Sequence, residues 1–118
     1  MLSITDKNLL NTISDFSSIP VGASYNIRKN GAGIERSTNE KVQITNKTDK
    51  PGIDITVFPD TKGEKIYIPV IITEEGVSDK VYNDFYIGEN ADVTIIAGCG
   101  IHNSGCSESR HEGIHRFF

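Results

Sequence analysis

Five side chains that commonly bind metal ions lie close together near the end of the chain. The sequence holds two cysteines and three histidines, and they are Cys99, His102, Cys106, His111 and His115. Thiolate and imidazole groups are the usual protein ligands of zinc, iron and copper. The cluster therefore predicts a metal site. We select Cys99, His102, His111 and His115 as its ligands and rank Cys106 below Cys99.

The spacing of the cluster leaves a second interpretation open. The order C-x2-H-x3-C-x4-H-x3-H differs from that of zinc fingers, zinc ribbons and HExxH helices. If residues 111 to 117 form a strand, His111 and His115 start from backbone positions ~13 Å apart, too far for one ion to bridge. The alternative is that the cysteines are small buried apolar residues and the histidines are hydrogen-bonded or solvated.

Length and composition limit the class of protein. The chain has 118 residues, 36% of them hydrophobic, a formal net charge of −4 and 11 glycines. We expect one domain over residues 1–118, built mainly from β-strands. The negative charge gives no electrostatic footprint for nucleic acid or an anionic membrane. Residues 1–6 lack the pattern of a secretory signal, so we expect a cytoplasmic protein with reduced cysteines.

The apolar pattern predicts one helix followed by short strands. Leu9, Leu10, Ile13 and Phe16 recur at helical spacing over residues 3–16, with Ser3 or Thr5 as the cap. Asn30-Gly31 predicts a hairpin over residues 26–36. Strands are then expected with centres near residues 43, 55, 69, 84 and 96. At Pro69, which cannot donate to a strand ladder, we expect an edge, a bend or a bulge.

An interval of twelve to fifteen residues between strand centres suits two architectures, an antiparallel β-sandwich or the coils of a β-solenoid. In a solenoid, residues one coil apart stack ~4.8 Å apart. Cys99 would then stack on His111, and His102 on His115, which would gather four ligands on neighbouring rungs. Asp79, Asp84 and Glu89 are interpreted as parts of solvated faces.

Several blocks, taken in order, resemble the N-terminal part of the SufB/SufD core family of SUF iron–sulfur cluster assembly scaffolds. The blocks are YNIRKNG (25–31), DKPGIDI (49–55), VYNDFYIGE (81–89), DVTIIAGCGIH (92–102) and HEGIH (111–115). The resemblance implies a right-handed parallel β-helix. It divides the single domain into a helix and hairpin arm (1–40) and the first coils of the core (41–118).

The resemblance also implies a role without enzymatic activity and without catalytic residues. The chain would be a component or truncated relative of the SUF scaffold that acts through contacts with a SufC-like ATPase and a SufB/SufD-like subunit. An iron–sulfur cluster, iron or zinc are the candidate cofactors. The cluster-assembly residues of the family lie beyond the part that resembles this chain, so none is transferred.

Members of that family are longer than this chain, so we expect a fragment or a shortened relative that ends within a coil. An unfinished coil exposes strand edges, and we therefore expect a homodimer. The alternative function is a small zinc- or iron-binding domain, or a metal-dependent enzyme, that uses the Cys/His cluster.

Overall fold

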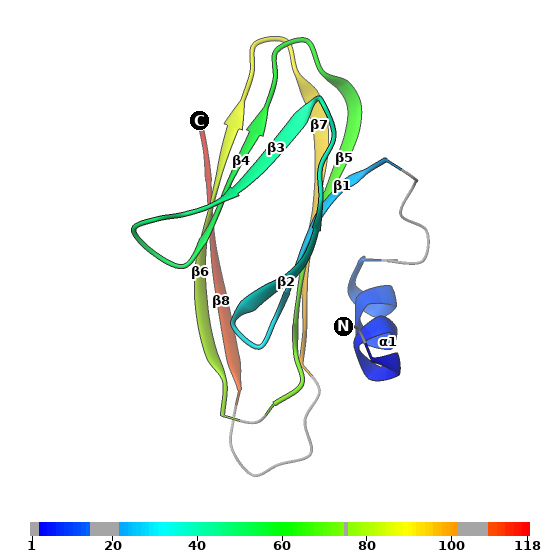
Figure 1. Ribbon diagram of the computed structural model, residues 1–118, viewed down its shortest axis with the longest axis vertical. Helices are drawn as coiled ribbons and strands as arrows, with labels where there is room; N and C mark the ends of the chain where they lie inside the picture. The colour runs from blue at the N-terminus through cyan, green and yellow to red at the C-terminus, as the bar shows by residue number, and fades with distance from the viewer. Residues whose placement is uncertain (1–2, 15–21, 75, 102–108) are drawn as a thin grey trace.

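The computed structural model describes residues 3–14, 22–74, 76–101 and 109–118 (Figure 1). These residues form one N-terminal helix and two four-stranded mixed sheets, so the expectation of a mainly β protein with a short helix is confirmed. The elements are α1 (Ile4–Ser14), β1 (Ser24–Lys29), β2 (Ala32–Ser37), β3 (Val42–Asn46), β4 (Gly52–Val57), β5 (Lys62–Ile72), β6 (Ser78–Ile87), β7 (Asp92–Ile101) and β8 (Arg110–Phe117). In the described part of the chain, no helix has the length and apolar character that crossing a membrane requires.

Helix α1 begins with the expected cap. The Ser3 hydroxyl accepts a hydrogen bond from the backbone N–H of Asp6, and the Asp6 carboxylate accepts one from the N–H of Ser3. Asp6 also pairs with Lys29 of β1 at 2.7 Å. Leu10 is fully buried against Ile27 and Ile71, so the helix docks on the outer face of a sheet of its own domain.

The hairpin of β1 and β2 forms around Asn30 and Gly31, as expected. Both residues have positive φ, 49° and 84°, which suits the two-residue turn that Asn-Gly favours. The hairpin is an integral part of a sheet, because β1 also pairs in parallel with β5. The Asn30 side chain joins the turn to the end of β5 through two hydrogen bonds with Thr73.

The chain alternates between the two sheets from β4 to β8. One sheet has the order β2-β1-β5-β7 and the other β3-β4-β6-β8. The pairs β1–β5, β5–β7, β4–β6 and β6–β8 are all parallel, and the two hairpins, β1–β2 and β3–β4, supply the antiparallel pairs. The alternative of an antiparallel sandwich is therefore wrong.

From β4 to β8, strands that are neighbours in a sheet lie about twice as far apart in the sequence as expected. Ile66 pairs with Ile95, an interval of 29 residues, and Ser78 pairs with Arg110, an interval of 32. In this part of the chain, the strand interval of twelve to fifteen residues separates strands of opposite sheets instead. The stacking of Cys99 on His111 was thus a wrong expectation, because β7 and β8 lie in different sheets.

Pro69 lies in β5, between β1 and β7, although we expected an edge, a bend or a bulge there. Its register with Gly98 of β7 is regular. On the β1 side, pairs form at Tyr67 and at Val70 but not at the two residues between them. The interruption matches the chemistry of proline, which has no N–H to donate.

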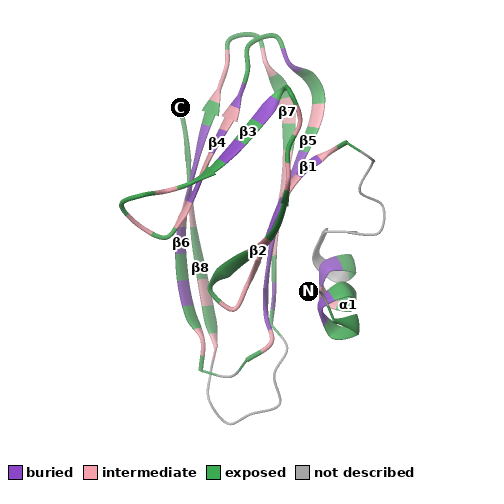
Figure 2. Ribbon diagram, viewed as in Figure 1, coloured by how far each residue is buried: buried purple, intermediate pink, exposed green. Residues whose placement is uncertain are grey.

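The main core lies between the two sheets. It is made of buried residues of β3, β4, β5 and β6, namely Val42, Ile44, Ile53, Ile55, Val57, Ile66, Ile68 and Phe85. Val93 and Ile95 of β7 pack against it and are partly buried. Figure 2 shows how burial decreases toward β8, in which every residue is described and none is buried. β7 and β8 are the last strands of their sheets.

Candidate functional site

The structure places three of the four predicted ligands in one hollow but not by the predicted stacking. Cys99 lies in β7 opposite Val70, whereas His111 and His115 lie in β8 opposite Asp79 and Asn83. Cys99 and His111 therefore belong to different sheets, and the predicted ladder between them is wrong. His102 and Cys106 lie outside the described residues.

The hollow opens between the ends of the two sheets and has a volume of about 250 Å³. Residues of β7 form one wall and residues of β8 form the other. Its lining consists of Ile68, Val70, Asn83, Ala97, Gly98, Cys99, His111, Gly113 and His115. Because side chains alternate along a strand, His111, Gly113 and His115 all face inward from β8. The sequence cluster is thus brought together across the interior.

His111 is oriented by a buried carboxylate. Its Nδ1 atom lies 3.3 Å from Oδ2 of Asp79, whose side chain is buried. Asp79 also accepts two hydrogen bonds from Arg28, both of 2.9 Å. Burial alone would raise the pKa of Asp79, but the hydrogen bonds and charge of Arg28, with those of His111, lower it. The expectation that Asp79 belongs to a solvated face is wrong.

His115 leans toward His111 across Gly113. A Cβ atom at Gly113 would lie 3.3 Å from Nε2 of His111 and 3.4 Å from Nε2 of His115. The two nitrogens are therefore no farther apart than the sum of these distances, far less than the strand spacing alone predicts. Desolvation lowers the pKa of His115, and the charge of His111 lowers it further.

Cys99 is a free thiol on the opposite wall. Its pKa is raised, first by desolvation and then by the negative charge of Asp79. A nucleophilic cysteine needs the reverse shift, since the thiolate is the reactive form. Desolvation and the nearby Asp79 carboxylate therefore favour a neutral thiol over an activated nucleophile.

No group of three or more Cys, His, Asp or Glu side chains is arranged to hold a metal ion in the parts of the chain that the structure describes. The complete set of Cys99, His102, His111 and His115 stays a prediction, since His102 lies outside those parts. The donor types nevertheless suit zinc or ferrous iron, because imidazole and thiolate are ligands of both.

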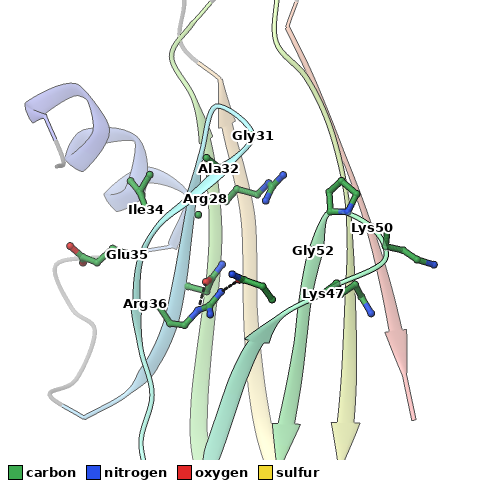
Figure 3. A pocket seen from close by; sticks show the side chains of 13 residues that line it. Arg28, Gly31, Ala32, Ile34, Glu35, Arg36, Lys47, Lys50 and Gly52 are labelled. Atoms are coloured by element: carbon green, nitrogen blue, oxygen red, sulfur yellow. Dashed lines mark hydrogen bonds between the residues drawn. The ribbon is translucent and has the colours of Figure 1, made fainter.

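A second hollow of about 520 Å³ lies at the opposite end of the interior, beside the two hairpins (Figure 3). Four basic residues line it, and all four have partners inside the protein. Arg28 pairs with Asp79, Arg36 bonds to two asparagine side chains, Lys47 pairs with Asp54 and Asp84, and Lys50 pairs with Asp49. Because these cations are already engaged, the hollow is a poor anion site.

A small cavity of about 20 Å³ lies between the two hollows. It shares Asn26 and Arg28 with the hollow beside the hairpins. It shares Asn83 with the hollow lined by Cys99, His111 and His115, which we call the Cys/His hollow. We call this part of the interior the polar half; it consists of Asn26, Arg28, Asp79, Asn83, Cys99, His111 and His115. Sequence reasoning missed Arg28 and Asp79, because they are 51 residues apart and no local pattern links them.

Comparisons with protein-family models, curated proteins and solved structures found no match to this chain.

Proposed function

We propose that this chain is a component, or a shortened relative, of a SUF-type iron–sulfur cluster assembly scaffold in the cytoplasm. It acts through contacts with other proteins, with a SufC-like ATPase and a SufB/SufD-like subunit as partners. Its strands are the first coils of a right-handed parallel β-helix. The ordered sequence blocks that resemble the SufB/SufD core are the first support for this proposal.

The arrangement of the last two strands is the observation that carries the proposal. β7 and β8 follow one another in the chain, end their respective sheets and line the same hollow. Their outer backbone edges therefore face the same end of the molecule. Such edges pair readily with further strands, either of a solenoid partner or of a second copy.

Exposed apolar side chains accompany these edges. Ile101 of β7 is 46% exposed and Phe117 of β8 is 62% exposed. Residues of this kind, in strands that end their sheets among the described residues, suit a protein contact better than a solvent-facing surface. Docking at this end would bury both the apolar side chains and the backbone edges.

The test is association with purified SufC-like and SufB/SufD-like subunits, measured by size-exclusion chromatography with light scattering. The chain should form a complex with them, and should dimerise when alone. The double variant Ile101→Lys with Phe117→Lys should abolish both, since charges at a strand edge oppose pairing. Ile4→Lys, at an 80% exposed residue of α1, is the matched control and should change neither.

Two results would refute the proposal. One is a chain that stays monomeric at high concentration and binds neither subunit. The other is association that the Ile4→Lys control weakens as much as the double variant, which would place the contact away from β7 and β8.

A further inference from the structure

A buried amide lines the Cys/His hollow without a hydrogen-bond partner. Asn83 is only 7% exposed and lies on the inward face of β6, between the core positions of Val81 and Phe85. It pairs in register with His115 of β8. No described residue forms a hydrogen bond with its side chain. A buried amide without a partner is costly, so Asn83 points to a polar ligand group that binds in the hollow.

The two histidines of β8 add polar groups to the same wall. A Cβ atom at Gly113 would lie 3.3 Å from Nε2 of His111 and 3.4 Å from Nε2 of His115. Gly113 has no side chain, so both nitrogens reach the same space. Among the described residues, neither Nε2 atom has a hydrogen-bond partner. Two neighbouring strands therefore present three unsatisfied polar groups to one ligand.

Asp79 decides which nitrogen of His111 carries the proton. Nδ1 of His111 lies 3.3 Å from Oδ2 of Asp79. Arg28 donates two hydrogen bonds of 2.9 Å to this carboxylate, which stabilise its ionised form. An ionised carboxylate only accepts hydrogen bonds, so Nδ1 of the neutral imidazole donates and Nε2 is an acceptor. His111 therefore presents a lone pair to the hollow.

His115 complements this acceptor. Desolvation lowers the pKa of His115, and the charge of His111 lowers it further, so the neutral ring is favoured. The tautomer with its proton on Nε2 donates into the space that His111 faces. A hydroxyl group fits between them, because it both donates and accepts. A carboxylate or phosphate would meet the lone pair of His111, and an ammonium group has no acceptor for the N–H of His115.

The facing wall of the hollow is apolar. Ile68 and Val70 of β5 and Ala97 of β7 line it. The hollow has a volume of about 250 Å³, whereas an apolar cavity of about 150 Å³ is enough to bind benzene. Its size and lining therefore suit a ligand of about one ring, with a polar end and an apolar body.

We propose that the Cys/His hollow binds a small neutral hydroxyl compound of the size of phenol. The hydroxyl donates to Nε2 of His111 and accepts from Nε2 of His115, and the Asn83 amide donates to the remaining lone pair of the oxygen. The body of the ligand packs against the apolar wall. Asp79 is a positioning residue, because it acts through His111. The site goes beyond the scaffold role, since it uses residues of a single chain.

The experiment is titration of the chain with phenol, and separately with toluene, by calorimetry and proton NMR. Phenol should saturate one site per chain, and toluene, which has the same shape without the hydroxyl, should bind at least tenfold more weakly. His115→Leu and Asn83→Leu should each weaken phenol binding about fivefold, the effect of one hydrogen bond, and should leave toluene binding within twofold. Gly113→Val should abolish the binding of both compounds, because its side chain fills the shared space.

The tautomer of His111 tests the role of Asp79 separately. Nitrogen-15 NMR of the wild type should show a protonated Nδ1 and an unprotonated Nε2 in His111. Asp79→Asn should increase the population with a protonated Nε2, because an amide can donate to Nδ1, and should weaken phenol binding about fivefold. A purely structural role of Asp79 would leave the tautomer unchanged.

Tyr86→Phe is the matched control, since Tyr86 is a 42% exposed residue on the outward face of the same strand as Asn83. It should keep the phenol affinity within twofold of that of the wild type. Circular dichroism and thermal unfolding identify any loss of affinity that comes from misfolding. Where Asn83→Leu or Asp79→Asn fails to fold, His115→Leu decides, because His115 is exposed.

Four outcomes would overturn the proposal: no saturable phenol binding, toluene binding as tight as that of phenol, a phenol affinity that His115→Leu leaves unchanged, or an equal loss in Tyr86→Phe. A wild-type His111 with its proton on Nε2 would overturn it as well. All titrations use the chain without SUF subunits, so these outcomes are independent of whether the chain binds those subunits.

Discussion

The space between the two sheets has an apolar half and a polar half, and the two are built differently. The apolar half is the main core, in which Ile55, Ile66 and Phe85 are fully buried and pack without directional bonds. The polar half buries Asp79 and Asn83, and the Asp79 carboxylate is matched by hydrogen bonds from Arg28. Apolar burial stabilises in proportion to area, whereas a buried polar group stabilises only where its partner is in place.

The same strands contribute to both halves. In β6 the inward positions run from Asp79 to Phe85, and in β8 they run from His111 to Phe117. Phe85 stacks on Phe117 at 4.8 Å, while Asp79 contacts His111. The division is therefore a property of position along the strands, and it concentrates the groups capable of chemistry at one end of the interior.

The largest expected effect comes from the apolar half. Phe85→Ala should lower the free energy of unfolding by about 3–5 kcal/mol, because it removes a fully buried ring and leaves a cavity. Phe117→Ala, which removes the 62% exposed partner of the same stack, should cost only about 1 kcal/mol. Urea unfolding at one fixed protein concentration measures both. Equal costs would mean that Phe117 is covered in solution, as docking at β7 and β8 would require.

The polar half should be the next most sensitive region. Asp79→Ala leaves the Arg28 guanidinium, whose side chain is only 16% exposed, without its carboxylate partner. It should lower the free energy of unfolding by about 3 kcal/mol. The double variant Asp79→Leu with Arg28→Met removes both charges and should be much closer to the wild type, because no buried charge is left unpaired. Urea unfolding of the two variants side by side tests this. A double variant as unstable as Asp79→Ala would contradict the pairing.

Local patterns in the sequence were enough to predict single elements. The Ser3 cap and the Asn30-Gly31 turn are each set by neighbouring residues, and the structure confirms both. The pairing of strands was not predictable in this way. Strands about thirty residues apart meet in register, and nothing within one strand specifies which other strand will be its neighbour.

The candidate site was predictable only in part, because its residues come from strands whose pairing no local pattern specifies. The sequence identified Cys99, His111 and His115 by their chemistry, but it placed Cys99 beside His111 on one sheet, since it took one strand to be one coil. The role of Asp79 was missed because its partners lie 51 residues before it and 32 residues after it. The expectation that Asp84 belongs to a solvated face is also wrong, because its buried side chain accepts hydrogen bonds from Arg116 of β8.

Acid should destabilise the protein through Asp84, whose side chain lies on the outer face of β6, outside the polar half. Hydrogen bonds from Arg116 lower the pKa of Asp84 to about 2, against the opposing effect of burial and with added support from Lys47. A lowered carboxyl pKa means that the stabilisation is complete above the unfolded-state value of 3.8 and is lost as the pH falls through the folded value.

The free energy of unfolding should therefore fall between pH 4 and pH 2, and Asp84→Asn should flatten that decline. Urea unfolding at several pH values in this range measures it. Tyr86→Phe, at the exposed side chain on the same face of β6, is the control and should keep the decline. An Asp84→Asn profile parallel to that of the wild type would show that other carboxylates cause the acid sensitivity.

The smallest effect distinguishes the Cys/His hollow from an ordinary sheet edge. Gly33 in β2 and Gly113 in β8 both lie in edge strands, but a Cβ at Gly33 meets nothing within 4 Å, whereas one at Gly113 meets both imidazoles. Gly33→Ala should raise the free energy of unfolding by about 0.5 kcal/mol, since alanine restricts the unfolded chain. Gly113→Ala should raise the free energy of unfolding by less, because the two imidazole rings must rotate apart. Proton NMR contacts between His111 and His115 should weaken only in that variant. Equal gains with unchanged ring contacts would show that the imidazoles do not converge on Gly113 in solution.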